Sequence, residues 1–123
     1  MINKELLSKV LDNEVPYQVK VHKIIIKNNS LNYFYNSKDS GGGLFEANEY
    51  INIYELAHKC KEWALSKGYI INSGATTSND WSSTIYKVIK ENPYTKELSH
   101  TWGQSENEAI FRACQWILDK DSK

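Results

Sequence analysis

Three histidines and two cysteines are the side chains of this 123-residue chain that would bind a soft metal ion. They are His22, His58, His100, Cys60 and Cys114. On a helix, side chains two positions apart point about 200° from each other, so His58 and Cys60 cannot chelate one ion together. No C-x-x-C or H-x-x-x-H spacing occurs in the chain. We therefore expect no metal site and no cofactor.

Hydroxyl groups are plentiful, but their pattern does not predict a hydrolase. Serines and threonines gather in residues 73–78 and 82–84, without the G-x-S-x-G turn that exposes a nucleophile. No carboxylate is tied to a histidine by local spacing. The three glycines of residues 41–43 are followed by Leu44 and Phe45, not by the Lys and Ser or Thr of a phosphate-binding loop. We expect no catalytic residue here, although a site assembled from distant segments stays an alternative.

The aromatic residues have two interpretations. Tyr33 and Tyr35 should share one face of a strand while Phe34 points to the other, because side chains alternate along a strand. We favour a core role for most aromatics, and a protein partner over single-stranded bases for any exposed set. The surface most suited to a partner then combines the two tyrosines with the glycine-rich loop of residues 39–45. It contains Tyr33, Tyr35, Gly41, Gly42, Gly43 and Phe45.

The charge balance disfavours nucleic acid without excluding it. The formal net charge is +0, from 15 basic and 15 acidic residues, so no overall field attracts a polyanion. Arg112 is the single arginine, and arginine is the residue that reads bases and phosphates with two hydrogen bonds. If the protein does bind nucleic acid, the expected phosphate contacts are Lys87, Lys90 and Lys96.

The chain carries no sign of export or membrane insertion. Its N-terminal segment lacks the apolar core of a signal peptide, and no apolar run approaches the length of a membrane span. Both cysteines occupy apolar positions of helical patterns, which favours small core residues over a disulfide. We expect a cytoplasmic protein with reduced thiols.

Two hydrogen-bonding signatures mark helix starts. Ser105 and Glu108 have the S-x-x-E spacing of a capping box, and Asn52 with Glu55 has a similar N-x-x-E spacing. Gly68 should end the earlier of these two helices in a left-handed conformation. A further short helix is expected over residues 3–11.

Strands are expected where β-branched and aromatic residues alternate with polar ones. The expected ranges are 17–27, 31–36, 69–72, 81–89 and 95–102, with 28–30 as a hairpin turn and 81–89 as a central strand. The order is therefore α-β-β-α-β-β-β-α. We predict one α+β domain over residues 1–123, with an antiparallel sheet of about five strands and helices packed on it. Residues 1–13 form an N-terminal helical arm, and residues 120–123 a disordered tail.

The helix, three strands and helix of residues 53–118 resemble the double-stranded RNA-binding domain in topology. In that family the last helix begins with a small-residue turn and lysines that grip phosphates. This chain keeps Gly103, the cap and the alanines, but has Glu106, Asn107 and Glu108 where the lysines would stand. The resemblance thus implies the fold and leaves RNA binding in doubt.

The same segment is similar to small bacterial and phage proteins with an α/β/α sandwich, which carry no settled activity. The residues that carry this likeness are Gly103, Ala109, Ile110, Ala113 and Cys114. It implies an origin in a phage or mobile element. The sequence thus predicts a cofactor-free accessory protein that binds an unidentified protein, with a nucleic-acid-binding protein and a small enzyme as alternatives.

Overall fold

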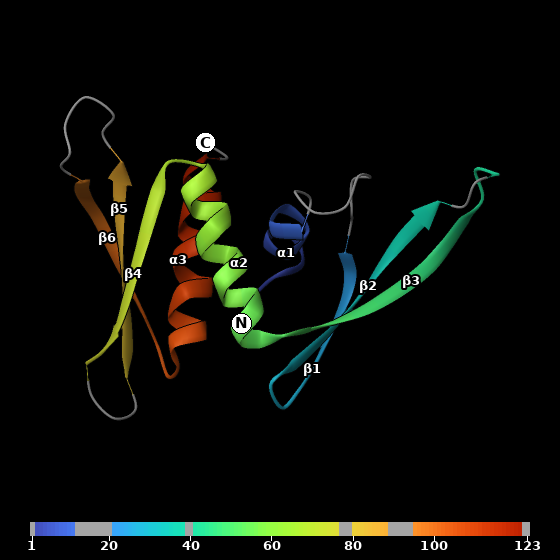
Figure 1. Ribbon diagram of the computed structural model, residues 1–123, viewed down its shortest axis with the longest axis horizontal. Coiled ribbons are helices and arrows are strands. Elements are labelled where there is room, and N and C mark those ends of the chain that lie inside the picture. The colour runs from blue at the N-terminus through green and yellow to red at the C-terminus, as the bar shows by residue number, and fades with distance from the viewer. Residues whose placement is uncertain (1, 12–20, 39–40, 77–79, 89–94, 122–123) are drawn as a thin grey trace. The chain divides into compact units, whose positions relative to one another are not determined.

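The computed structural model describes residues 2–11, 21–38, 41–76, 80–88 and 95–121 (Figure 1). These residues form two compact units. The N-terminal unit is Asn3–Leu56, and the C-terminal unit is Ala57–Lys123 together with Met1–Ile2. Each unit has its own three-stranded antiparallel sheet.

The N-terminal unit consists of a short helix and the sheet β1-β2-β3. Its elements are α1 (Lys4–Leu11), β1 (Val21–Lys27), β2 (Ser30–Lys38) and β3 (Leu44–Asn52). Asn3 Oδ1 accepts the Leu6 N–H at 2.8 Å, which caps α1. The Ser8 hydroxyl then accepts the Val21 N–H at 2.9 Å and ties the helix to β1. Burial of the apolar side of α1 and of one face of the sheet makes a small core, which includes Leu6, Leu7, Val10, Leu11, Val21, Leu31, Tyr33 and Ile51.

A tight turn joins β1 to β2, and β3 runs directly into helix α2 (Ile53–Ser66). Asn28 in the turn has a φ of 58°, a left-handed conformation that asparagine tolerates. Asn52 Oδ1 accepts the N–H groups of Tyr54 at 2.8 Å and Glu55 at 3.4 Å. The Ile53 N–H bonds to the Asn29 carbonyl at 2.8 Å. The predicted cap at Asn52 is therefore confirmed.

The C-terminal unit places α3 across all three strands of the sheet β4-β5-β6. The elements are β4 (Tyr69–Ala75), β5 (Trp81–Val88), β6 (Thr95–Gly103) and α3 (Glu106–Asp121). Gly68 has the expected positive φ, 89°, after α2. The Glu108 N–H bonds to Ser105 Oγ at 3.2 Å, while the Glu108 carboxylate accepts the Gln104 N–H, so the predicted cap of α3 is confirmed. The core of the C-terminal unit includes Cys60, Trp63, Ala64, Ile71, Ile85, Phe111, Cys114, Ile117 and Leu118.

The α+β class is confirmed, but the single sheet of about five strands is wrong. Two three-stranded sheets are present, and the element order is α-β-β-β-α-β-β-β-α. The strand missing from the prediction is β3, whose residues are mostly exposed and so lack alternation between apolar and polar positions. As predicted, β5 is the central strand of its sheet.

Element ends differ modestly from the prediction. β4 continues to Ala75, three residues beyond its expected end, and α3 includes Lys120 and Asp121 of the predicted tail. No helix in the described ranges is long and apolar enough to cross a lipid bilayer.

Candidate interaction surface

One face of the N-terminal sheet is left open by α1. Leu31, Tyr33 and Ile51 point to the buried side, and their neighbours along the strands point to the opposite side. The register aligns this opposite side in two rows across the sheet. The rows are Ile25–Asn32–Tyr50 and Lys23–Phe34–Asn48, and we call these six residues the open face.

The centre of the open face is apolar and exposed. Ile25 is 44% exposed and Tyr50 is 71% exposed, although both belong to the largest apolar side chains of the unit. Phe34 is half-buried, and the Lys23 ammonium lies 5.1 Å from the centre of its ring. A cation over an aromatic ring gains about 0.5–1 kcal/mol at an exposed site, which orders Lys23 beside the apolar centre.

Asn32 introduces an unsatisfied polar atom in the middle of this face. It lies between Ile25 and Tyr50 in the sheet register. Its Oδ1 is buried and has no hydrogen-bond partner among the described residues. A buried acceptor without a hydrogen-bond partner lowers the free energy of unfolding by about 1–3 kcal/mol, so Asn32 destabilises the isolated unit.

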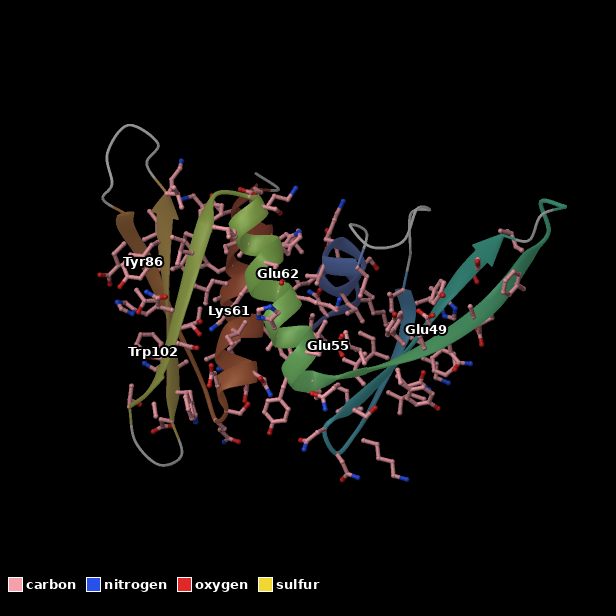
Figure 2. The ribbon with its side chains drawn as sticks, viewed as in Figure 1. Glu49, Glu55, Lys61, Glu62, Tyr86 and Trp102 are labelled. Carbon is pink, nitrogen blue, oxygen red and sulfur yellow. The ribbon has the colours of Figure 1, made fainter. Side chains whose placement is uncertain are left out.

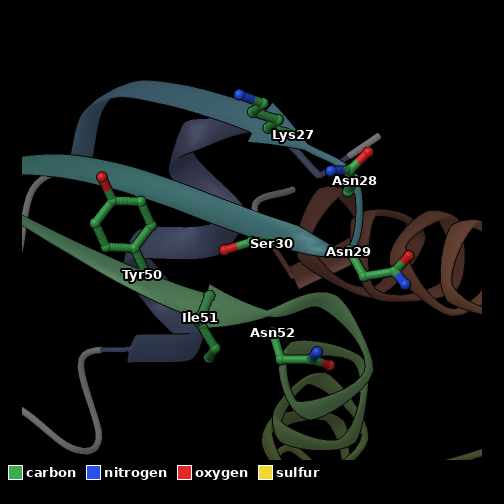
Figure 3. Close-up of a pocket in the computed structure, with 7 residues that line it drawn as sticks. All are labelled: Lys27, Asn28, Asn29, Ser30, Tyr50, Ile51 and Asn52. Carbon is green, nitrogen blue, oxygen red and sulfur yellow. The ribbon is translucent and has the colours of Figure 1, made fainter.

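A shallow hollow of about 350 Å³ lies at the turn end of the open face (Figure 3). It is lined by Lys27, Asn28, Asn29, Ser30, Tyr50, Ile51 and Asn52. The adjacent N–H groups at the start of α2 already bond to Asn29 and Asn52, so they are not available to an anion. The hollow therefore extends the open face with amide groups, and its titratable lining residues are Lys27 and Tyr50.

The predicted tyrosine surface is corrected by the packing. Tyr33 is 6% exposed, so it belongs to the core and cannot contact a partner. It stacks on the half-buried Tyr35 with ring centres 5.8 Å apart, as expected for side chains on one face. The Tyr33 hydroxyl donates to Glu49 Oε2 at 2.9 Å. Burial, and then the charge and hydrogen bonding of Glu49, raise the pKa of Tyr35.

The predicted loop contributes exposed residues, but Phe45 is not part of it. Gly41, Gly42 and Gly43 are exposed and lead into β3. Phe45 lies in β3, opposite Ser37 of β2, and is 49% exposed. The predicted loop of residues 39–45 is thus wrong for its last two residues, Leu44 and Phe45, which begin β3.

The outer face of the C-terminal sheet carries a fixed histidine. Thr84 Oγ1 and His100 Nδ1 are 3.0 Å apart, and His100 Nε2 contacts the Glu97 carboxylate. The His100 ring also lies 5.9 Å from that of Trp102, which is 57% exposed (Figure 2). Threonine, histidine and glutamate in this order resemble a nucleophile, base and orienting acid. The three side chains lie on an exposed sheet face, which does not exclude water as such catalysis requires.

A second polar cluster links α2, β4 and α3, and sequence reasoning missed it. Lys61, labelled in Figure 2, donates from Nζ to Ser73 Oγ at 3.3 Å, and Ser73 donates to Glu106 Oε1 at 2.9 Å. Because the Ser73 proton points to Glu106, Lys61 acts as a donor and not as a base. Glu108 pairs with Arg112 at 2.6 Å, so both acidic residues of the first turn of α3 have internal partners. The first turn of α3 therefore presents two carboxylates that are held by groups of the same unit.

Two of the three lysines predicted as phosphate contacts lie at described positions of the C-terminal sheet. Lys87 is exposed near the end of β5, and its register partner on β6 is Lys96. Lys90 lies outside the described residues. The sheet therefore brings two of the three positions side by side.

Among the described residues, no three histidine, cysteine, aspartate or glutamate side chains form a group that could hold a metal ion. His22 pairs with Glu46 at 3.3 Å and His58 with Glu62 at 2.8 Å. Cys60 and Cys114 are buried free thiols, and Cys114 Sγ donates to the Cys60 carbonyl at 3.4 Å. The hydrogen bond with Cys114, and then burial, raise the pKa of Cys60 well above its ordinary value.

Compared with protein-family models, curated proteins and solved structures, the chain matches none of them.

Proposed function

We propose that this protein is a cofactor-free interaction module that binds another protein through the open face of its N-terminal sheet. The observation that supports this most is the exposure of Ile25 and Tyr50, at 44% and 71%, on either side of the unpartnered Asn32 oxygen. Apolar surface rimmed by polar groups is typical of protein contact sites. A partner that covers Ile25 and Tyr50 would remove their exposed apolar area from water.

The charged rim of the open face favours a partner with carboxylates around an apolar contact. Lys23 borders Phe34, and Lys27 lines the hollow beside Tyr50. On the described part of this face, Glu46 is the carboxylate nearest to these groups in the register, and it pairs with His22. Acidic side chains of a partner would therefore meet lysines and not carboxylates.

The proposal is tested by capturing partners with the full chain and with two matched variants. Tyr50→Ser with Ile25→Ser removes the apolar centre, whereas Trp102→Ser removes an exposed aromatic from the other sheet. After chemical crosslinking in a native lysate, proteins captured by the wild type should be lost with the double variant and retained with Trp102→Ser. Equal capture by all three proteins would refute the proposal.

Nucleic-acid binding is a second candidate, supported by the pairing of Lys87 with Lys96 in the sheet register. This register brings two lysine positions together on neighbouring strands, and lysines supply the positive charge that phosphate binding requires. Binding of single strands or duplexes should weaken steeply between about 50 and 200 mM salt and be reduced in Lys87→Gln. A gel shift at low salt that shows no retardation would refute this candidate.

A further inference from the structure

β3 is a long edge strand whose protection against strand pairing is limited to two carboxylates, Glu46 and Glu49. It lies on the outer side of β2 and pairs with it over nine residues without a register shift (Figure 1). Its sequence, LFEANEYIN, contains no proline and no lysine. Natural sheets protect their edges with bulges, lysines, prolines or a covering element. Among the described residues, β2 is the only strand that bonds to β3, so the outer N–H and C=O groups of β3 have no strand partner.

Two of the other three edge strands carry such protection. β1 has an irregular register after Val21, carries Lys23 and Lys27, and packs against α1. β6 has an irregular register where it meets Ile85 and Tyr86. β4 is regular like β3 but has seven residues against nine, so β3 is the longest edge strand with an unbroken register in the described part of the chain.

We infer that β3 pairs with β3 of a second copy of this chain, antiparallel and centred on Asn48. This register uses the full length of both strands and places Asn48 opposite its own copy. A twofold axis perpendicular to the sheet then makes one continuous six-stranded sheet from the two three-stranded sheets. Because that axis keeps each face on its own side, the two open faces become one surface.

The side chains fit this register. Phe45 meets Ile51 of the other copy, which covers an aromatic ring that is 49% exposed in the single chain. Glu46 meets Tyr50, and Glu49 meets Ala47, so no two carboxylates stand directly opposite each other. The two Asn48 amides meet at the centre, where each can donate to and accept from the other. The strand is therefore compatible with its own copy along its whole length.

The inference is tested by charge substitutions at Asn48, an exposed residue of β3. Sedimentation of the wild-type chain at about 100 µM should show a dimer. Asn48→Lys and Asn48→Asp each place like charges together at the twofold axis, so each alone should be a monomer. Mixing the two variants should restore the dimer, because lysine then faces aspartate.

Asn36→Lys is the matched control. Asn36 is equally exposed, on the central strand β2, where it cannot meet its copy, so this variant should remain a dimer. Circular dichroism establishes that each variant is folded. The inference is wrong if the wild type is a monomer at this concentration, if Asn48→Lys alone stays dimeric, or if the mixture fails to recover the dimer. Sedimentation of the purified chain measures self-association alone, whereas the capture experiment measures other proteins, so failure of one proposal is distinguished from failure of the other.

Discussion

Ser83 offers a substitution that should stabilise the protein. It lies on the central strand β5 between Ser73 and Thr101 in the register, is fully buried, and its hydroxyl has no hydrogen-bond partner among the described residues. A buried unsatisfied hydroxyl costs about 1–3 kcal/mol, and Ser83→Ala removes it with the loss of one atom's packing. We expect the free energy of unfolding to rise by about 1 kcal/mol and the melting temperature by about 3–5 °C.

The assay is urea unfolding followed by far-ultraviolet circular dichroism, with Thr101→Val as a contrasting variant. Thr101 Oγ1 donates to the Ala109 carbonyl at 2.8 Å, so its loss should lower the free energy of unfolding by about 1 kcal/mol. A rise in the free energy of unfolding for Ser83→Ala and a fall for Thr101→Val would show that a hydroxyl stabilises this sheet only where it has a hydrogen-bond partner. A loss of stability in Ser83→Ala would refute the reasoning, because it would mean that the hydroxyl has a partner in the folded protein.

Three further predictions concern local geometry and titration. Gly103→Ala should destabilise the protein by about 1–3 kcal/mol in thermal unfolding, because the added Cβ would lie 2.8 Å from a backbone nitrogen in the first turn of α3. Gly74→Ala, with nothing within 4 Å of the new Cβ, is its control and should change stability little. Ser105→Ala removes the α3 cap and should cost about 1 kcal/mol in urea unfolding. Burial first, and the Asp121 charge second, raise the pKa of Tyr69 above its ordinary 10.0. The neutral Tyr69 side chain therefore contributes its full stability below pH 10.0, and this contribution is lost as the pH rises through the raised pKa of the folded state. Asp121→Asn should reduce this alkaline loss in unfolding measured from about pH 9 to 11.

The features that sequence reasoning predicted correctly depend on residues close together in the chain. The caps at Asn52 and Ser105 join groups two or three positions apart, and Gly68 ends its helix through its own backbone conformation. The shared face of Tyr33 and Tyr35 follows from strand alternation. Such features need no knowledge of the rest of the fold.

The features that it missed depend on distant contacts. Which side of Tyr33 is covered depends on α1, and no pattern within β2 indicates it. Lys61, Ser73 and Glu106 come from three elements and meet only after the C-terminal unit folds. β3 lacks the apolar alternation of a half-buried strand because neither of its faces is covered along most of its length.

The two units differ in their exposed polar and apolar groups, and this difference supports the proposed binding surface on the N-terminal sheet. In the C-terminal unit, Ser73, Thr101 and Glu108 all bond to other groups of the same unit, and the unpartnered Ser83 hydroxyl is out of reach of any ligand. In the N-terminal unit, the backbone edge of β3 faces outward beside exposed apolar side chains. A group already bonded within its own fold gains little from a ligand, whereas an exposed backbone group exchanges its bond to water for one to the ligand, with a net gain of about 0.5–1.5 kcal/mol. Binding should therefore be lost through substitutions on the N-terminal sheet and survive those on the C-terminal one.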